Sequence, residues 1–294
     1  MNKRIIETHM HLSNHWFQNQ FPYIDYENGE YKITPNGDLN SLIDLMKDRG
    51  IALILDPAID LESNERLLEL SEKHPGFIAC AVGNHPTRTI TSKWSDRRKL
   101  EEWAKHSNVV AIGEAGLDYH FPRNQQHRLR QLMWFIYQIK LADRANLPLV
   151  LHIREADKDA IRVLRLFKDR LHGGVCHCFG SGPDIAQIYT EELGFSLGIG
   201  GTLLMREEIS KSLIQTVIKT PIEHLILETD SPYVKPEKPA EFSGKAWRKA
   251  RNTSLILPAV TQRIAELKGM SCEDVERITF NNAVRVFDLG RFVN

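Results

Sequence analysis

The sequence predicts a single α/β domain, a (β/α)8 barrel of the TIM type that spans residues 1–294. Eight short apolar runs recur along the chain, and segments with helical spacing of apolar residues fill the gaps between them. Most of the runs are continuously apolar, as expected for parallel strands that are covered on both faces. A doubly wound open sheet is the alternative, but no glycine-rich phosphate loop follows any run. The regular alternation of strand and helix therefore favours the barrel.

The expected strands are the apolar runs themselves. They cover residues 4–12, 51–56, 77–85, 108–116, 147–154, 173–179, 194–200 and 223–230. The expected helices show apolar residues at helical spacing, and the first two end at Gly50 and at the Pro75–Gly76 pair. They cover residues 39–50, 62–76, 125–148, 160–171, 182–193, 206–221, 254–269 and 272–287.

The composition is that of an ordinary soluble globular protein, with 42% hydrophobic and 26% charged residues. The formal net charge is zero, so any binding to polyanions requires a local patch of positive charge. Four cysteines without disulfide-like spacing favour a reducing compartment. No run approaches the roughly 18 apolar residues of a membrane span, and no apolar leader begins the chain. We therefore expect a cytoplasmic protein with no membrane contact.

Polar side chains occupy the carboxyl ends of six expected strands. The opening stretch "IIETHMHLSNH" places Glu7, His9 and His11 at alternate positions, so that a strand would point all three the same way. The other strand ends carry His85, Glu114, His152 with Arg154, His177, and Glu228 with Asp230. A single histidine in a strand is usually a satisfied core residue. Six strand ends in register are not explained in this way, because barrel active sites lie at this face.

The mixture of imidazoles and carboxylates indicates a metal centre. It suits Zn²⁺, Mn²⁺ or a similar cation, whereas Mg²⁺ prefers oxygen ligands. Six ligands are enough for two ions about 3.5–4 Å apart, and Glu114 is the natural bridging carboxylate. Glu7 and Glu228 are expected to lie behind the ligands and to orient them. Cys176 and Cys178 would point away from His177 in a regular strand, so we do not expect them to bind metal.

Taken together, these segments resemble the TatD family of metal-dependent hydrolases. The resemblance runs through "ETHMHL", "GNHP", "GEAGLD", "LHIR", "HCFGSG", "ETDSPY" and "RNTSLILPAVTQRIAELKG" to "NNAVRVF". It implies a two-metal barrel that cleaves phosphodiester bonds as a DNase acting on single strands or 3′ ends. It also implies that one ion is held by His9, His11 and Asp230, that the other is held by His152 and His177, and that Glu114 is shared. The family usually has Asp where this chain has Glu7, and the 13–37 segment of this chain is longer than the resemblance leads us to expect.

The expected mechanism is attack on phosphorus by a water that the metals activate, with Glu114 and Asp230 as catalytic carboxylates and Asp230 as the general base. Arg154 would contact the phosphate or pair with a neighbouring acid. His85 would contact the phosphate, donate a proton to the leaving oxygen, or orient a ligand.

Two long segments are expected to be loops at the active face: residues 13–37 and 231–252. The first carries six aromatic residues, which could stack on unpaired bases, cover the barrel rim or dock a partner protein. The second carries six cations, which could follow a nucleic-acid backbone or form a solvated face. These cations are Lys235, Lys238, Lys245, Arg248, Lys249 and Arg251.

Two other functions remain open at the sequence level. The same metal-activated water could attack a carbonyl carbon, so that an amide or ester such as a D-aminoacyl-tRNA is the substrate. Alternatively, the barrel could serve as a subunit of a larger nucleic-acid-processing assembly. The cations and Arg154 favour a phosphodiester in DNA.

Overall fold

The computed structural model describes residues 5–293 and contains one sheet of eight strands, in the order β1-β4-β5-β6-β7-β8-β9-β10. The strands are β1 (Ile5–Glu7), β4 (Ile51–Pro57), β5 (Ile78–Val82), β6 (Val109–Asp118), β7 (Leu149–Arg154), β8 (Gly174–Cys176), β9 (Phe195–Ile199) and β10 (Leu225–Leu227). The pairing is parallel, and each strand lies within, or within two residues of, an expected run. The predicted α/β TIM-like fold is thus confirmed.

The first strand has a neighbour on each side. Ile5 of β1 is in register with Ile51 of β4, and the Thr8 N–H donates to the carbonyl of Leu227 at the end of β10 (3.0 Å). The first and last strands of the sheet are therefore joined, as barrel closure requires.

Several strands end earlier than expected. The first expected strand was to run from residue 4, which lies outside the described residues, to residue 12, but β1 ends at Glu7. Similarly, β8 ends at Cys176. His9, His11 and His177 therefore follow their strands, so the expectation that strand pleating presents Glu7, His9 and His11 on one face was wrong.

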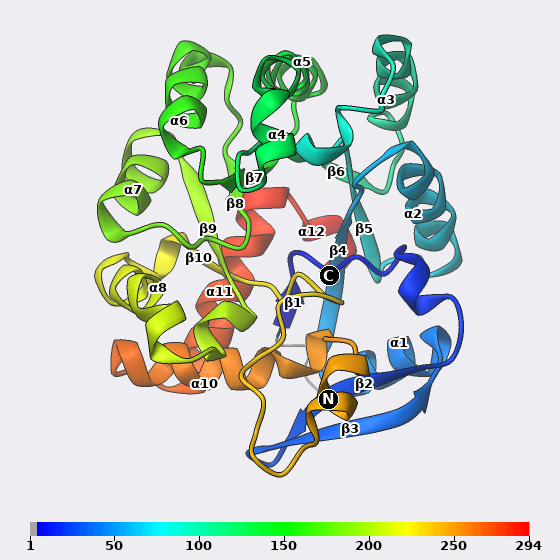
Figure 1. The fold of residues 1–294 in the computed structure, drawn as a ribbon, viewed down its shortest axis with the longest axis vertical. Coiled ribbons are helices and arrows are strands. Elements are labelled where there is room, and N and C mark those ends of the chain that lie inside the picture. The colour runs from blue at the N-terminus through cyan, green and yellow to red at the C-terminus, as the bar shows by residue number, and fades with distance from the viewer. Residues whose placement is uncertain (1–4, 294) are drawn as a thin grey trace. The chain divides into compact units, whose positions relative to one another are not determined.

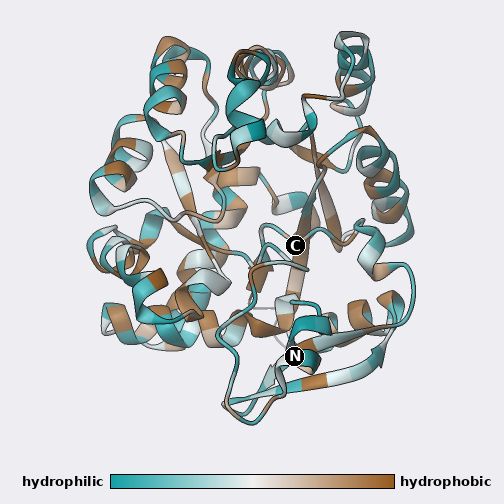
Figure 2. Cartoon of the chain, in the orientation of Figure 1, coloured by the Kyte–Doolittle hydropathy of each residue, from teal (hydrophilic) through white to brown (hydrophobic). Residues whose placement is uncertain are grey.

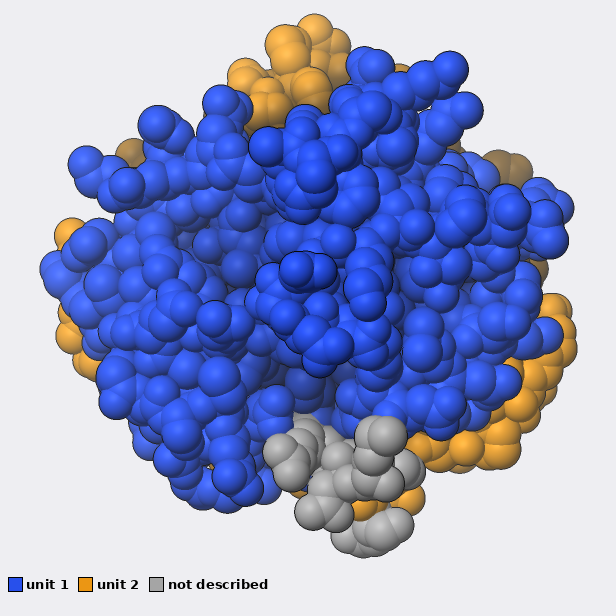
Figure 3. Space-filling model, turned by 90° about the horizontal axis from the view of Figure 1, so that it is seen from below, with its two compact units in different colours: residues 1–54, 178–183, 198–283 blue, residues 55–177, 184–197, 284–294 orange. Residues whose placement is uncertain are grey.

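The chain divides into two compact units, each made of several sequence segments (Figure 3). Unit 1 comprises residues 1–54, 178–183 and 198–283, and unit 2 comprises residues 55–177, 184–197 and 284–294. The helical ribbons of both units alternate between teal and brown along their length, as expected for helices that bury one face (Figure 2).

In unit 1 the expected helices form close to their predicted limits. They are α1 (Leu39–Asp48), α8 (Glu207–Lys219), α10 (Leu257–Lys268) and most of α11 (Cys272–Phe287). Asp38 caps α1 by accepting from the Ser41 N–H, and Gly269 ends α10 in the left-handed conformation. A short helix that was not predicted, α9 (Gly244–Lys249), lies inside the expected 231–252 loop.

Unit 2 contains α2 (Leu61–Lys73), α3 (Arg97–Trp103), α4 (Pro122–Gln126), α5 (Arg128–Ala145), α6 (Asp157–Leu166) and α7 (Pro183–Gln187). The longest expected helix breaks at His127 into α4 and α5, and α3 was not predicted. A π-helical turn at Ile188–Glu192 continues α7. On α5, the buried Trp134 and Phe135 contribute to the core against β6.

The segment 13–37 is not the loop that we expected, because most of it forms an antiparallel hairpin in unit 1 (Figure 1). Strand β2 (Phe21–Glu27) pairs with β3 (Glu30–Gly37) through a turn at Asn28–Gly29, where both residues have positive φ. Arg251 adds to β2, because its N–H donates to Pro22 (2.7 Å) and its carbonyl accepts from Ile24 (2.9 Å). The two long segments of the sequence therefore pack together.

Along residues 5–293, none of the helices combines the length and the apolarity that a membrane span requires.

Candidate metal centre

The first group of candidate ligands lies in unit 1 and consists of His9, His11 and Asp230. The Asp230 Oδ1 is 3.3 Å from the His11 Nε2 and 3.9 Å from the His9 Nε2. One ligand atom from each residue lies within 4.8 Å of those of the other two. Both imidazoles are buried, whereas Asp230 is partly exposed. We call these three residues the first cluster.

Backbone hydrogen bonds bring the two segments of the first cluster together. The Asp230 N–H donates to the His9 carbonyl (2.9 Å), and the His11 N–H donates to the Ser231 carbonyl (2.8 Å). Asp230 adopts a left-handed backbone with φ of 55°, which is uncommon for a residue with a side chain. Such strained positions gather at functional sites.

Glu7 holds the backbone beside the first cluster. Its carboxylate accepts from the N–H groups of His9 and Thr229 (both 3.0 Å) and from the hydroxyls of Thr229 (2.7 Å) and Ser254 (2.9 Å). Burial raises the pKa of Glu7 to about 7, although these hydrogen bonds oppose the shift. Glu7 thus positions His9 through the main chain.

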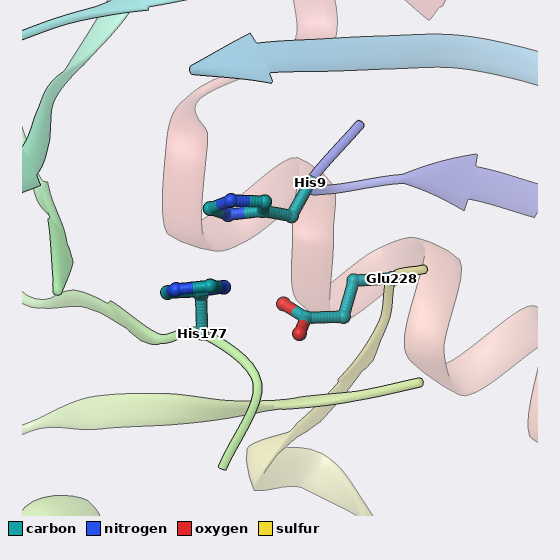
Figure 4. Close-up of side chains that lie close together, drawn as sticks. All are labelled: His9, His177 and Glu228. Atoms are coloured by element: carbon teal, nitrogen blue, oxygen red, sulfur yellow. The ribbon is translucent and has the colours of Figure 1, made fainter. Parts of the chain in front are cut away.

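Glu228 is a further carboxylate in unit 1, and it lies close to His9. Ligand atoms of His9 and Glu228 lie within 4.8 Å of each other, and Figure 4 draws both side chains together with His177, which belongs to unit 2. The Glu228 carboxylate accepts the N–H of Cys178, whose φ is 46°. A Cβ at Gly198 would collide with this carboxylate, so position 198 needs glycine.

The second group of candidate ligands lies in unit 2, around the carboxylate of Glu114. Its Oε1 is 3.0 Å from the His177 Nε2, 3.4 Å from the His152 Nδ1 and 3.8 Å from the His85 Nε2. The His152 Nδ1 and the His177 Nε2 are 3.0 Å apart. We call these four residues the second cluster.

Glycines allow Glu114 to reach this position. The pairing of β6 with β7 shifts register between Ile112 and Ala115, which flank Gly113 and Glu114. A Cβ at Gly113 would press against the backbone and side chain of Val150, and one at Gly83 would collide with Gly113. The close approach of these strands therefore requires glycine at both positions.

Asp118, the last residue of β6, is a site residue that the sequence analysis missed. Its Oδ2 is 3.1 Å from the His152 Nε2, and its Oδ1 accepts from the His120 N–H and the Asn124 amide. Burial lowers the pKa of His152, but Asp118 and Glu114 outweigh that effect and raise it to about 9. Burial alone would raise the pKa of Asp118, but its hydrogen bonds, chiefly that with His152, together outweigh burial and hold this pKa below its usual range. Alternation along "GEAGLD" could have revealed Asp118, because it lies four residues after Glu114.

His85 lies beside Glu114 and His152. Ligand atoms of His85, Glu114 and His152 lie within 4.8 Å of one another, and the rings of His85 and His152 are 4.2 Å apart. The His85 Nδ1 faces the Thr87 hydroxyl at 2.7 Å. Burial, with the neighbouring His152, lowers the pKa of His85 to about 3.

Arg154 ends β7 and is exposed. Its guanidinium lies 5.8 Å from the centre of the Phe121 ring. Cys176 is buried in β8.

The basic 231–252 segment uses part of its charge internally. The Lys235 ammonium donates to the carbonyls of Trp247 (2.7 Å), Arg248 (3.1 Å) and Ala250 (3.3 Å) at the end of α9. The Lys238 ammonium donates to the carbonyls of Pro239 and Phe242. Lys235, whose three donors are all engaged, is therefore available for neither of the two expected uses of these cations, a nucleic-acid contact or a solvated face.

The chemistry of the donors fits divalent metal. Each cluster offers imidazole nitrogens and carboxylate oxygens at distances that a single ion can span, and this mixture suits Zn²⁺ or Mn²⁺. Neither cluster contains a cysteine, so the candidate donor atoms are imidazole nitrogens and carboxylate oxygens.

Comparison with known proteins agrees with this chemistry. Residues 6–288 match the model of the family described as TatD-related DNase. An uncharacterized metal-dependent hydrolase of Bacillus subtilis, YabD, is 32% identical over 86% of this chain and 94% of its own length. A protein of Yersinia pseudotuberculosis named 3′-5′ ssDNA/RNA exonuclease TatD is 31% identical over 86% of this chain and 94% of its own.

Solved structures show the same fold. The crystal structure of YJJV, a TatD homolog from Escherichia coli, aligns with a TM-score of 0.80 and 25% identity, covering 98% of this chain and 99% of the other. A TatD-family hydrolase from Entamoeba histolytica aligns with a TM-score of 0.78 and 22% identity, with 98% and 99% coverage. With a family model matched along nearly its whole length, the chain belongs to the TatD-related DNase family and is a metal-dependent hydrolase.

Proposed function

We propose that the protein is a nuclease that hydrolyses phosphodiester bonds in single-stranded DNA, from the 3′ end, with two divalent cations. The main support is the presence of two imidazole–carboxylate clusters at the carboxyl ends of strands in one parallel sheet. Relatives named 3′-5′ ssDNA/RNA exonuclease, at 29–31% identity, favour this substrate.

The proposed ligands follow the two clusters. His9, His11 and Asp230 would hold one cation, and His152 and His177 would hold the other. Glu114 would serve both, because a carboxylate has two oxygens that can bind different ions. Asp118 would support the second cluster by orienting His152.

The cations, when bound, would lower the pKa of water toward about 7 and offset the charge that develops on the phosphate. Asp230 would accept the proton of the attacking water, because its carboxylate is partly exposed beside the first cluster. A bond forms between the water oxygen and phosphorus, the bond from phosphorus to the 3′ oxygen breaks, and that oxygen takes a proton from solvent to leave as a hydroxyl. Arg154 and His85 would contact the phosphate oxygens.

The test compares the full chain with two variants, after metal is removed and Mn²⁺, Mg²⁺ or Zn²⁺ is supplied. End-labelled single-stranded DNA is the substrate, Asp230→Asn is the active-site variant, and Asp48→Asn, at an exposed carboxylate ending α1, is the control. We expect metal-dependent release of 3′ nucleotides by the wild type and Asp48→Asn, and loss of that release in Asp230→Asn.

The same assay separates the alternatives. If internal cleavage produced fragments, the protein would be an endonuclease rather than an exonuclease. Failure to cleave DNA with any metal, together with release of the amino acid from a D-aminoacyl-tRNA, would replace the nuclease with an esterase. Inactivity toward both substrates with metal bound would favour a role within an assembly.

A further inference from the structure

The ring of Tyr233 is an exposed aromatic surface beside the first cluster. Tyr233 lies three residues after Asp230, and its N–H donates to the Asp230 carbonyl (2.8 Å), which closes a tight turn. The centre of its ring is 6.0 Å from that of His11, and 38% of the residue is exposed. The turn therefore fixes the ring next to two candidate metal ligands.

A second segment supports this ring from behind. The centre of the Trp16 ring lies 5.3 Å from that of Tyr233, and the side-chain amide of Asn14 donates to the Tyr233 hydroxyl (2.9 Å). The Arg251 guanidinium lies 4.3 Å from the centre of the Trp16 ring. Trp16 is itself held in place, so Tyr233 loses little conformational freedom when a ligand contacts it.

The other aromatic residues of the 13–37 segment are committed elsewhere. Phe17, Phe21 and Tyr23 are buried in the core. Tyr26 and Tyr31 contact each other on the hairpin at 5.0 Å between ring centres. Tyr26 also donates to Gln262 of α10, so this pair belongs to the hairpin rather than to the first cluster.

We propose that Tyr233 is a substrate-binding residue that stacks on an unpaired base flanking the scissile phosphate, with Trp16 as its positioning residue. This inference rests on the proposed nuclease function. A phosphate held at the first cluster would bring a neighbouring base to the Tyr233 ring. Stacking tolerates any sequence, because every base has a π face, but a base inside a duplex is already covered by its neighbours. The ring would thus favour single strands.

The test uses pairs of oligonucleotides that differ only in one base. Single-stranded DNA with all its bases is compared with the same strand lacking the 3′-terminal or the penultimate base, the sugar–phosphate backbone being intact. Binding to protein loaded with Mn²⁺ is measured by fluorescence anisotropy with strands that carry a cleavage-resistant phosphorothioate linkage, and kcat and KM are measured with Mn²⁺ and ordinary strands. The variants are Tyr233→Leu, Tyr233→Phe and Trp16→Leu, with Tyr31→Leu as the control on the hairpin.

Removing one flanking base should weaken wild-type binding roughly 5- to 150-fold, which corresponds to the 1–3 kcal/mol of one base stack. Tyr233→Leu should lose this preference and raise KM more than it lowers kcat, whereas Tyr233→Phe and Tyr31→Leu should keep it. Trp16→Leu should reduce the preference in part.

The two failures are distinguishable. If the wild type cleaves DNA but is indifferent to both base removals, or if Tyr233→Leu retains the preference, the stacking role is overturned and the nuclease function stands. If no oligonucleotide is bound or cleaved, both are overturned.

Discussion

Glu7 is a buried carboxylate that accepts four hydrogen bonds, and it lies two residues before His9 of the first cluster. Its partners lie on three separate segments, at His9, Thr229 and Ser254. A single side chain therefore connects the end of β1, the segment after β10 and the start of α10.

Replacing Glu7 with alanine should lower the free energy of unfolding by more than about 3 kcal/mol, because several buried donors lose their acceptor and each costs about 1–3 kcal/mol. Urea denaturation followed by circular dichroism measures the change. Thr229→Val, which removes one of the donors, is the control and should cost about 1 kcal/mol. A loss below that of Thr229→Val would show that the contacts of Glu7 contribute little.

Gly198 leaves the space that the Glu228 carboxylate occupies. Gly198→Ala should displace this carboxylate, weaken metal binding and cost about 1–3 kcal/mol of stability through overpacking. Metal titration and thermal unfolding measure the two effects. Gly244→Ala, where nothing lies within 4 Å of a new Cβ, is the matched control and should change neither. Unchanged metal affinity in Gly198→Ala would show that the Glu228 carboxylate does not contribute to metal binding.

At the scale of elements, the hairpin β2–β3 carries its own buried charge. Asp25 on β2 is 6% exposed, and the Arg49 guanidinium after α1 lies 3.3 Å from Asp25 and 2.7 Å from Glu27. Burial raises the pKa of Asp25 above its ordinary 3.8, and Arg49 offsets only part of that effect. The charged form of Asp25 therefore costs stability.

The folded state holds the Asp25 proton more tightly than the unfolded chain, so the stability that this proton contributes is present below pH 3.8 and is lost as pH rises through the raised pKa. Asp25→Asn cannot lose a proton there. Its free energy of unfolding, relative to that of the wild type, should therefore rise as the pH increases above 3.8.

The control for this pH dependence has the opposite sign. Asp38, the cap of α1, has its pKa lowered by the hydroxyl and N–H of Ser41, so the stability that its charge contributes is present above pH 3.8 and is lost as the pH falls below that value. Asp38→Asn should therefore be less stable than the wild type at neutral pH, and this difference should shrink as the pH falls below 3.8. Urea denaturation at several pH values measures both. If Asp25→Asn weakened with rising pH, the pair with Arg49 would outweigh the cost of burial.

At the scale of the whole molecule, the fold could be predicted from the sequence. The alternation of strand and helix segments and the continuously apolar strands remain visible even where single elements are shorter than expected. The elements that escaped prediction depend on short-range details. The hairpin was read as a loop although Asn28–Gly29 is a turn signal, and α9 is only six residues long.

The candidate site was predictable in part for a similar reason. Parallel strands bring their ends to one edge, so the ligand types could be gathered from the sequence. Alternation could have added Asp118 to this set, but the three carbonyls that bind the Lys235 ammonium could not be predicted, because they depend on where the 231–252 segment bends.

Metal should stabilise the folded chain and bind at two equivalents. A cation at a hundred times its Kd adds about 2.7 kcal/mol, so the midpoint of thermal unfolding should rise by several degrees with Mn²⁺. His11→Ala, in the first cluster, and His152→Ala, in the second, should each lower the bound metal from two equivalents to about one. Elemental analysis after dialysis measures the stoichiometry, with Asp48→Asn as the control. A single equivalent in the wild type would contradict the two-metal proposal.

The internal capping by Lys235 also affects how association with a polyanion should respond to ionic strength. Each cation that neutralises a phosphate of a single strand releases counterions and contributes about 0.7 to the slope of log K against log salt. Because the Lys235 ammonium donates to three carbonyls, it has no donor left for a phosphate, and a count of all six cations would overestimate the salt dependence of binding.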